Sequence, residues 1–153
     1  MVTLLVSFIG GTDAQRQMVK SGIEKQWTNT ADGLKTEVLE APSGISMNTI
    51  VIKSGGETNV YPTGPRRTMN FMNINPDDKN IAYGIAHEPG HLLGIRDHYT
   101  KIMDATGRRM IGNPVWPGYE HDVMGANGKF GMSTSDIWEI STSDQSIHIP
   151  MEE

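Results

Sequence analysis

The stretch HEPGHLLGIRDHY, residues 87–99, is the most informative part of this sequence. It opens with His-Glu-x-x-His. On an α-helix the two histidines lie four residues apart on one face, so both imidazoles can approach a single cation. Glu88 lies beside the first histidine and can reach a water molecule on that cation without binding the cation itself. The spacing therefore predicts a metal site with His87 and His91 as ligands and Glu88 as the general base.

The residues after the second histidine predict a third ligand. Gly94 allows a sharp turn at the end of the helix, because glycine adopts positive φ angles without a Cβ clash. That turn can bring Asp97 back toward the histidines and leave a fourth position open for water, as catalytic zinc requires. His98, the next residue, is the rival ligand. We favour Asp97, since its offset is the one that the turn geometry serves.

The identity of the metal follows from the side chains available to hold it. The chain contains no cysteine, so any metal must be bound by His, Asp or Glu. Zn²⁺ is the predicted cofactor, and other divalent transition metals accept the same ligands. Zinc would lower the pKa of a water molecule to roughly 7. Glu88 would take the proton of that water and pass it to the leaving amine of a peptide bond.

Composition excludes several other classes of protein. The formal net charge of −5 argues against a nucleic-acid partner, which needs a basic face, and against binding to an anionic membrane. No stretch approaches the roughly 20 apolar residues of a membrane span. Val2–Ile9 is apolar, but it lacks the basic start and the cleavage site of a signal peptide, so we interpret it as a strand. We expect the chain to act inside the cell that makes it or to be cut from a larger protein.

The hydrophobic pattern of the first half predicts a sheet with helices. A helix from Thr12 to about Trp27 begins with a capping box in which Gln15 is the partner, and Val19 and Ile23 share its apolar face. The predicted strands, each bounded by Gly, Pro or polar residues, are Val2–Ile9, Leu34–Leu39, Ser46–Lys53, a short edge strand at Asn59–Tyr61, and Met69–Ile74.

The second half combines one strong helix with irregular chain. Residues 76–78, Pro-Asp-Asp, are predicted to open the helix that carries the metal motif and ends at Gly94. Thr100–Asn127 is predicted to be irregular. Ser133 or Ser135 would cap a last short helix, in which Trp138 is expected to be a core or cap residue. The predicted fold is α+β, a single domain over residues 1–153 with a mixed twisted sheet and two main helices in 1–94 and a small irregular lobe in 95–153.

The metal motif resembles the metzincin signature H-E-x-x-H-x-x-G-x-x-H. It departs from that signature at Asp97, which stands where metzincins have the third histidine, a substitution found in some metzincin-like bacterial peptidases. The resemblance implies a zincin fold, zinc endopeptidase activity and a methionine beneath the metal in a tight turn. Met124, in HDVMGANG at 121–128, is the best candidate for this Met-turn, and Met132 is the fallback.

A second resemblance is to the zincin domains at the C-termini of bacterial RHS-type and other polymorphic toxins. It rests on the form H-E-x-G-H-x-x-G-apolar-x-D-x-Y of the motif, on the segment GTDAQRQ at 11–17, and on Val-Met-Gly at 123–125. It would cover most of the chain, although only the zinc motif is highly specific. It implies a toxic effector fragment of a larger secreted protein, delivered into a target cell and countered by an immunity or inhibitor protein.

Four further aromatic or histidine residues each have two possible roles. Tyr99 is predicted either to donate a hydrogen bond to an oxyanion or to close the turn as a half-buried tyrosine, and Tyr119 is a weaker candidate for the donor. His121 is more typical of a structural turn histidine than of a ligand or substrate contact. Trp116 would line the substrate cleft or anchor a loop.

Two functions compete with a peptidase that acts on protein or peptide substrates. The first is a zinc amidohydrolase that cleaves a cell-wall peptide or a small amide, with the same site residues. The second is a non-catalytic binding module stabilised by zinc. Glu88 argues against such a module, because a structural site has no use for a base beside its first ligand. A closed site with a fourth ligand, such as His98 or His121, would favour it.

Overall fold

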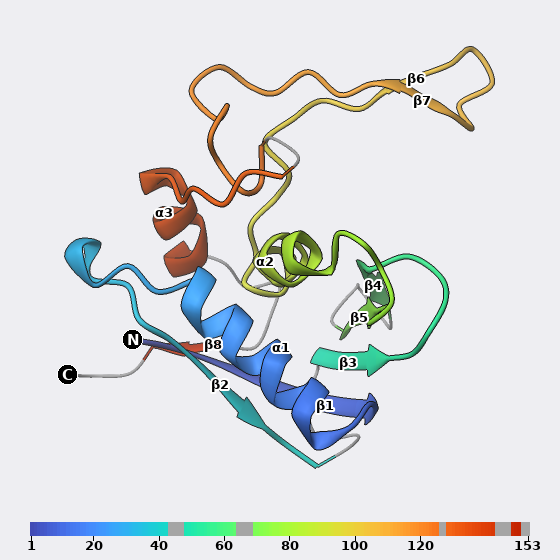
Figure 1. The fold of residues 1–153 in the computed structure, drawn as a ribbon. Coiled ribbons are helices and arrows are strands. Elements are labelled where there is room, and N and C mark those ends of the chain that lie inside the picture. Colours follow the sequence, from blue (N-terminus) through green and yellow to red (C-terminus); the bar gives the residue numbers. More distant parts are fainter. Residues whose placement is uncertain (43–47, 64–68, 126–127, 143–147, 151–153) are drawn as a thin grey trace.

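The computed structural model describes residues 1–42, 48–63, 69–125, 128–142 and 148–150 (Figure 1). Its elements, in chain order, are β1 Val2–Gly10, α1 Asp13–Gln26, the 3-10 helix Thr30–Asp32, β2 Thr36–Glu40, β3 Asn48–Ile52, β4 Asn59–Thr63, β5 Met69–Ile74, α2 Ile81–Leu92, β6 Ile102–Met103, β7 Met110–Gly112, α3 Thr134–Thr142 and β8 His148–Pro150. The strands predicted in the first half are all present; Ser46, the predicted start of β3, lies outside the described residues.

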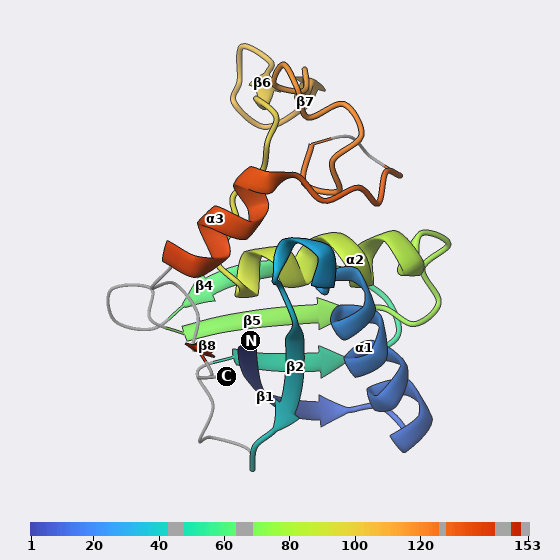
Figure 2. The same ribbon diagram turned by 90° about the vertical axis from the view of Figure 1, so that its left-hand side faces the viewer.

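One mixed, twisted sheet forms the base of the molecule (Figure 2). Its strand order is β2-β1-β3-β5-β4, and β8 pairs with β1. β1 runs parallel to β2 and to β3, β3 runs parallel to β5, and β4 and β8 are antiparallel to their partners. The predicted α+β class with a mixed sheet is thereby confirmed. Among the described strands β4 is the last on its side, so one of its edges faces away from the sheet.

Helices α1 and α2 lie on the same face of the sheet. α1 packs on β2, α2 packs on β4 and β5, and the two helices also contact each other. The predicted capping box is confirmed, because Thr12 Oγ1 accepts from Gln15 N at 3.1 Å and Gln15 Oε1 accepts from Thr12 N at 2.9 Å. Trp27, fully buried after the end of α1, donates its indole N–H to Ala86 O at 3.0 Å and joins α1 to α2.

The start of α2 corrects the sequence prediction. The helix begins at Ile81, not at Pro76-Asp77-Asp78. Asn75 Oδ1 accepts from Asp77 N at 3.0 Å, and Asp78 Oδ1 accepts from Asn80 N at 2.9 Å. Asparagine and aspartate favour such turns because their side chains satisfy the backbone two residues further on. Two successive turns of this kind therefore occupy the segment where helical residues were expected.

The described chain from α2 to α3 forms a second lobe above α2 (Figure 1). The predicted lobe over 95–153 is wrong at its end, because β8 joins the main sheet beside β1. The segment Thr100–Asn127, predicted to be irregular, contains a two-stranded hairpin of β6 and β7 that projects from the body. Ser133 rather than Ser135 caps α3: Asp136 N donates to Ser133 Oγ at 3.3 Å, and Ser133 N donates to Asp136 Oδ2 at 2.9 Å. Trp138 is not a core residue, since 65% of its surface is exposed. None of the described helices is long and apolar enough to cross a membrane.

Candidate metal centre

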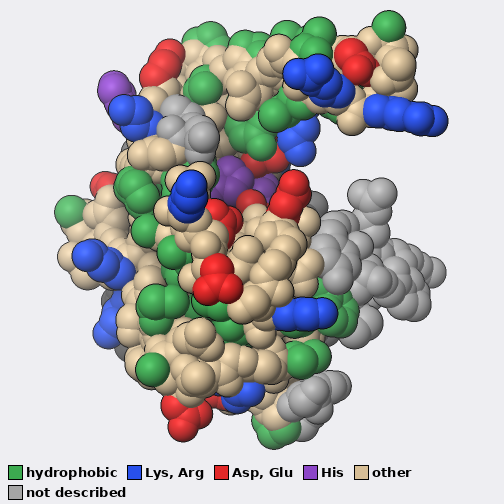
Figure 3. Space-filling view, turned by 45° about the vertical axis from the view of Figure 1, so that its right-hand side comes forward, with side chains coloured by type: hydrophobic (Ala, Val, Ile, Leu, Met, Phe, Trp, Pro, Cys, Tyr) green, Lys and Arg blue, Asp and Glu red, His purple; other side chains and the backbone are tan. Residues whose placement is uncertain are grey.

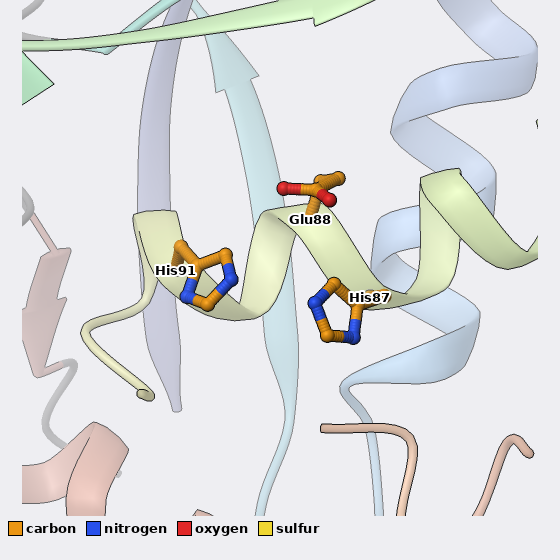
Figure 4. A group of neighbouring side chains, drawn as sticks. All are labelled: His87, Glu88 and His91. Atoms are coloured by element: carbon orange, nitrogen blue, oxygen red, sulfur yellow. The ribbon is translucent and has the colours of Figure 1, made fainter. Parts of the chain in front are cut away.

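Helix α2 presents two imidazoles on one side (Figure 4). His87 Nδ1 lies 2.8 Å from Val123 O, and His91 Nδ1 lies 2.8 Å from Ile95 O. A carbonyl oxygen can only accept, so each Nδ1 carries the proton and each Nε2 keeps its lone pair. This is the orientation that metal-binding histidines take when an outer partner fixes their tautomer.

The turn after α2 brings Asp97 to these lone pairs. Gly94 has a φ angle of 93°, and its amide donates to His91 O at 3.1 Å. Asp97 Oδ1 then lies 3.2 Å from His87 Nε2 and 3.3 Å from His91 Nε2. Among the described residues no hydrogen-bond donor satisfies this buried oxygen. Burial alone would raise the pKa of Asp97, but the two imidazoles outweigh this effect and lower the pKa below its usual value, so the carboxylate stays ionised.

Two separations among these three atoms match the geometry around a tetrahedral zinc ion. Zinc binds nitrogen and oxygen ligands at about 2.0–2.1 Å, and neighbouring corners of such a tetrahedron lie about 3.3–3.4 Å apart. The observed N–O separations of 3.2 and 3.3 Å match that edge length. The unsatisfied oxygen of Asp97 and the two lone pairs thus form a donor set suited to a metal ion, and all three residues line the cleft described below.

The carboxylate of Glu88 lies beside this donor set. Its carboxylate and the ring nitrogens of His87 and His91 offer atoms that lie within 4.8 Å of one another. Glu88 Oε2 accepts from Val60 N, in β4, at 3.0 Å, which fixes the carboxylate. Burial raises the pKa of Glu88 above its usual value, although the imidazoles oppose this effect. A raised pKa suits a carboxylate that must accept a proton near neutral pH.

The donor set lies in a cleft of about 430 Å³, where the histidines gather in the hollow below the overhanging second lobe (Figure 3). Tyr99 reaches into this cleft. Burial, together with the charge of Asp97, raises the pKa of Tyr99 to about 12, so its hydroxyl remains a proton donor. The cleft is lined by Glu57, Asn59, Val60, Asn70, His87, Glu88, His91, Asp97, Tyr99 and Lys101.

Met124 lies in a tight turn directly beneath α2. Gly125 N donates to Asp122 O at 3.0 Å, which closes the turn. Met124 is fully buried, and a Cβ atom on Gly90 would lie only 2.6 Å from its Sδ. Gly90 stands between the two histidines, so the methionine packs against the stretch of helix that carries them. Met132, the fallback, is partly buried against the core and has no such position.

The other residues singled out in the sequence lie away from the donor set. His98 is fully buried in a separate cluster with Asp122 and Asp136, so Asp97 and not His98 faces the two histidines. Tyr119 packs its ring on that of His98 and shares a hydrogen bond with Ser135 at 2.8 Å.

Trp116 and His121 also stay out of the described lining of the cleft. Trp116 donates its indole N–H to Thr100 Oγ1 at 3.1 Å, so it anchors a loop and does not line the described cleft. His121 is exposed, and its carbonyl accepts from Gly131 N at 3.0 Å.

Sequence reasoning missed the groups that orient the histidines. Two of them are main-chain carbonyls, of Val123 and Ile95, which leave no side-chain signal. The third is Tyr83, whose hydroxyl donates to Val123 O at 2.8 Å and lies 3.1 Å from His87 Nδ1. Tyr83 precedes His87 by four residues, and this spacing on one helix face was a signal that could have identified it.

No protein-family model matches the chain, and no curated protein matches it. Among solved structures, that of myroilysin is similar with a TM-score of 0.48 and 18% identity, over 88% of this chain and 70% of that one. A hatching enzyme zinc-protease from Oryzias latipes (Medaka fish) is similar with a TM-score of 0.45 and 10% identity, over 83% of this chain and 60% of that one. These likenesses are distant, and the side chains of the cleft therefore carry the functional argument.

Proposed function

We propose that this chain is a zinc-dependent endopeptidase of the metzincin type. The observation that carries the proposal is the convergence of His87 Nε2, His91 Nε2 and Asp97 Oδ1 at tetrahedral spacing in an open cleft, with Glu88 beside them. A structural zinc site does not need a carboxylate that lies beside the metal without binding it. A hydrolytic site does need one, because water must lose a proton as it attacks.

The residues of the cleft divide the chemistry among them. A zinc ion held by His87, His91 and Asp97 would supply a Lewis acid that acidifies water and polarises the carbonyl under attack. Glu88 takes the proton from the attacking water and delivers it to the leaving amine, while its hydrogen bond from Val60 N keeps it aimed at the cleft. The hydroxyl of Tyr99, protonated throughout the neutral range, donates to the oxyanion that develops on the carbonyl.

The outer edge of β4, the last of the described strands on its side of the sheet, favours an extended peptide as the substrate. Val60 pairs with Met72 of β5, yet its N–H is directed to Glu88. In an antiparallel ladder the N–H and C=O of one residue point the same way, so the carbonyl of Val60 also faces away from β5. A substrate strand can donate to that carbonyl as it lies along the edge. Strand addition binds the backbone of an internal stretch and needs no chain terminus, which favours an endopeptidase.

The test compares the wild type with Glu88→Gln, which removes the base and keeps the shape of the side chain. Zinc content is measured together with cleavage of a panel of unfolded proteins, short peptides, cell-wall peptides and small amides. We expect equal zinc content and a fall in kcat of about 10²–10⁴-fold for Glu88→Gln. Glu37→Gln, on β2 and away from the cleft, is the matched control and should keep full activity.

The same panel separates the competing functions. Cleavage restricted to cell-wall peptides or small amides would identify an amidohydrolase and refute the endopeptidase. Equal zinc content without cleavage of any substrate by the wild type would refute catalysis and indicate a zinc-stabilised binding module. Loss of zinc from the Glu88→Gln protein would show that Glu88 is a ligand and not a base.

A further inference from the structure

A second group of ionisable side chains lies in the core of the second lobe. It consists of His98, Asp122 and Asp136. His98 is the residue after Asp97, Asp122 begins the tight turn of Met124, and Asp136 lies in the first turn of α3. Their exposed fractions are 0%, 4% and 0%, and their nitrogen and oxygen atoms lie within 4.8 Å of one another. Charged groups are almost never buried so completely unless they are paired or coordinate a metal.

The separations within this cluster are those of ligands around a cation. His98 Nδ1 lies 3.4 Å from Asp122 Oδ1 and 3.5 Å from Asp136 Oδ1. A hydrogen bond between an imidazolium and a carboxylate is shorter, at about 2.7–2.9 Å. Corners of a tetrahedron around zinc lie about 3.3–3.4 Å apart. The distances in this cluster therefore resemble those between the three ligand atoms of the cleft.

Two oxygens of the cluster also lack well-placed donors. Among the described residues neither Asp122 Oδ2 nor Asp136 Oδ1 has a hydrogen-bond donor in good geometry, although the side chains of Ser133 and Asp136 lie close enough to lower the pKa of Asp122. Burial, together with the neighbouring Asp122, raises the pKa of Asp136 to about 7, which reflects the cost of holding two carboxylates together in the core. A divalent cation would neutralise both carboxylates and satisfy Asp122 Oδ2 and Asp136 Oδ1.

The outer contacts already orient these side chains toward a common point. His98 Nε2 lies 3.1 Å from Glu139 Oε1, so that nitrogen carries a proton and Nδ1 can offer its lone pair to a metal. Asp122 Oδ1 accepts from Met124 N at 2.6 Å, and Asp136 Oδ2 accepts from Ser133 N at 2.9 Å. A carboxylate behind a histidine is the arrangement that accompanies metal-binding imidazoles in many proteins.

We infer that His98, Asp122 and Asp136 bind a second divalent transition-metal ion, with a structural role. One carboxylate oxygen each from Asp122 and Asp136, together with Nδ1 of His98, supplies three ligand atoms of the types that zinc binds. The ion would join the loop after Asp97, the turn of Met124 and helix α3. This second lobe has few regular elements, so a buried ion gives it a fixed centre. The inference does not depend on the proposed peptidase activity.

The test counts zinc in the full chain by elemental analysis after equilibration with a zinc buffer and gel filtration. We expect two ions in the wild type, one in His91→Gln, in which the cleft loses a ligand, and one in Asp136→Asn. Asp77→Asn, an exposed aspartate ahead of α2, is the matched control and should keep both ions. The two sites can thus fail separately: loss of the ion only from the Asp136→Asn protein would refute the cleft site and uphold the second.

Thermal unfolding covers the case in which Asp136→Asn does not fold. The His91→Gln protein keeps the cluster intact, so its Tm should rise when zinc is added and fall when a chelator removes it. The inference would be overturned if the wild type held a single ion and the Tm of the His91→Gln protein did not change with zinc. The side chains of the cluster would then be held together by shared protons instead of a metal ion. Two ions retained in a folded Asp136→Asn protein would also overturn it.

Discussion

Gly90, between the two histidines of α2, is the residue where a single methyl group should matter most. A Cβ there would lie 2.6 Å from Met124 Sδ and 2.9 Å from Trp27 Cζ2. Both side chains are fully buried, and the indole of Trp27 is held by Ala86 O, so the tryptophan has no room to move. Gly90→Ala gains about 1 kcal/mol of helix propensity, but overpacking of a core costs about 1–3 kcal/mol. We expect a net destabilisation of up to about 2 kcal/mol.

A double-mutant cycle with Met124→Ala assigns this cost to its cause. Two of the three closest atoms belong to Met124, so Gly90→Ala should cost about 1 kcal/mol less in a Met124→Ala background. Urea unfolding of the zinc-loaded proteins gives the four free energies, and Tm should fall by about 2–4 °C per kcal/mol for a chain of this size. A stabilised Gly90→Ala protein, or costs that add within about 0.5 kcal/mol, would refute the packing of Met124 against α2.

Three further predictions concern the cleft and the fold. In the metal-free chain the pKa of His87 is raised, because the effect of Asp97 and of the carbonyl of Val123 outweighs the lowering by burial. Protons then compete with zinc for His87, so the affinity for zinc should fall as the pH falls through that raised pKa. Zinc titrations at a series of pH values measure this. Tyr99→Phe should keep its zinc and lose about 10²-fold in kcat, whereas unchanged kcat would leave the tyrosine a purely structural role. Thr12→Ala removes the capping box of α1 and should cost about 1 kcal/mol in urea unfolding with unchanged kcat, and a cost near zero would contradict the importance of that cap.

The sequence predicted those parts of the molecule that depend on local patterns. The capping box at Thr12 and the strands β1 to β5 were found because side-chain spacing and capping residues act over a few positions, whereas β8, which pairs with β1 from far along the chain, was not predicted. The start of α2 was missed, since the helix-starting charges Asp77 and Asp78 belong to turns instead. Trp138 was misplaced, because an aromatic residue in a short helix gives no sign of which face is covered.

The candidate site divides in the same way. His87, Glu88, His91 and Asp97 could be named because their spacing on a helix and turn fixes their proximity. His98, Asp122 and Asp136 come together only through the path of the second lobe, so their spacing in the sequence gave no signal. The resemblance to the zincin domains of polymorphic toxins, and with it the immunity partner, stays a prediction.

The two imidazoles of the cleft are oriented by main-chain carbonyls, of Val123 and Ile95. A carbonyl of the backbone is present whatever side chain the residue carries. A deep mutational scan should therefore find that changes at these two positions act through core packing alone, and that conservative apolar replacements leave metal binding intact. Insertions or deletions of one residue in the same loops would displace the carbonyls and should abolish it. The orientation of the ligands is thus encoded in loop length more than in residue identity.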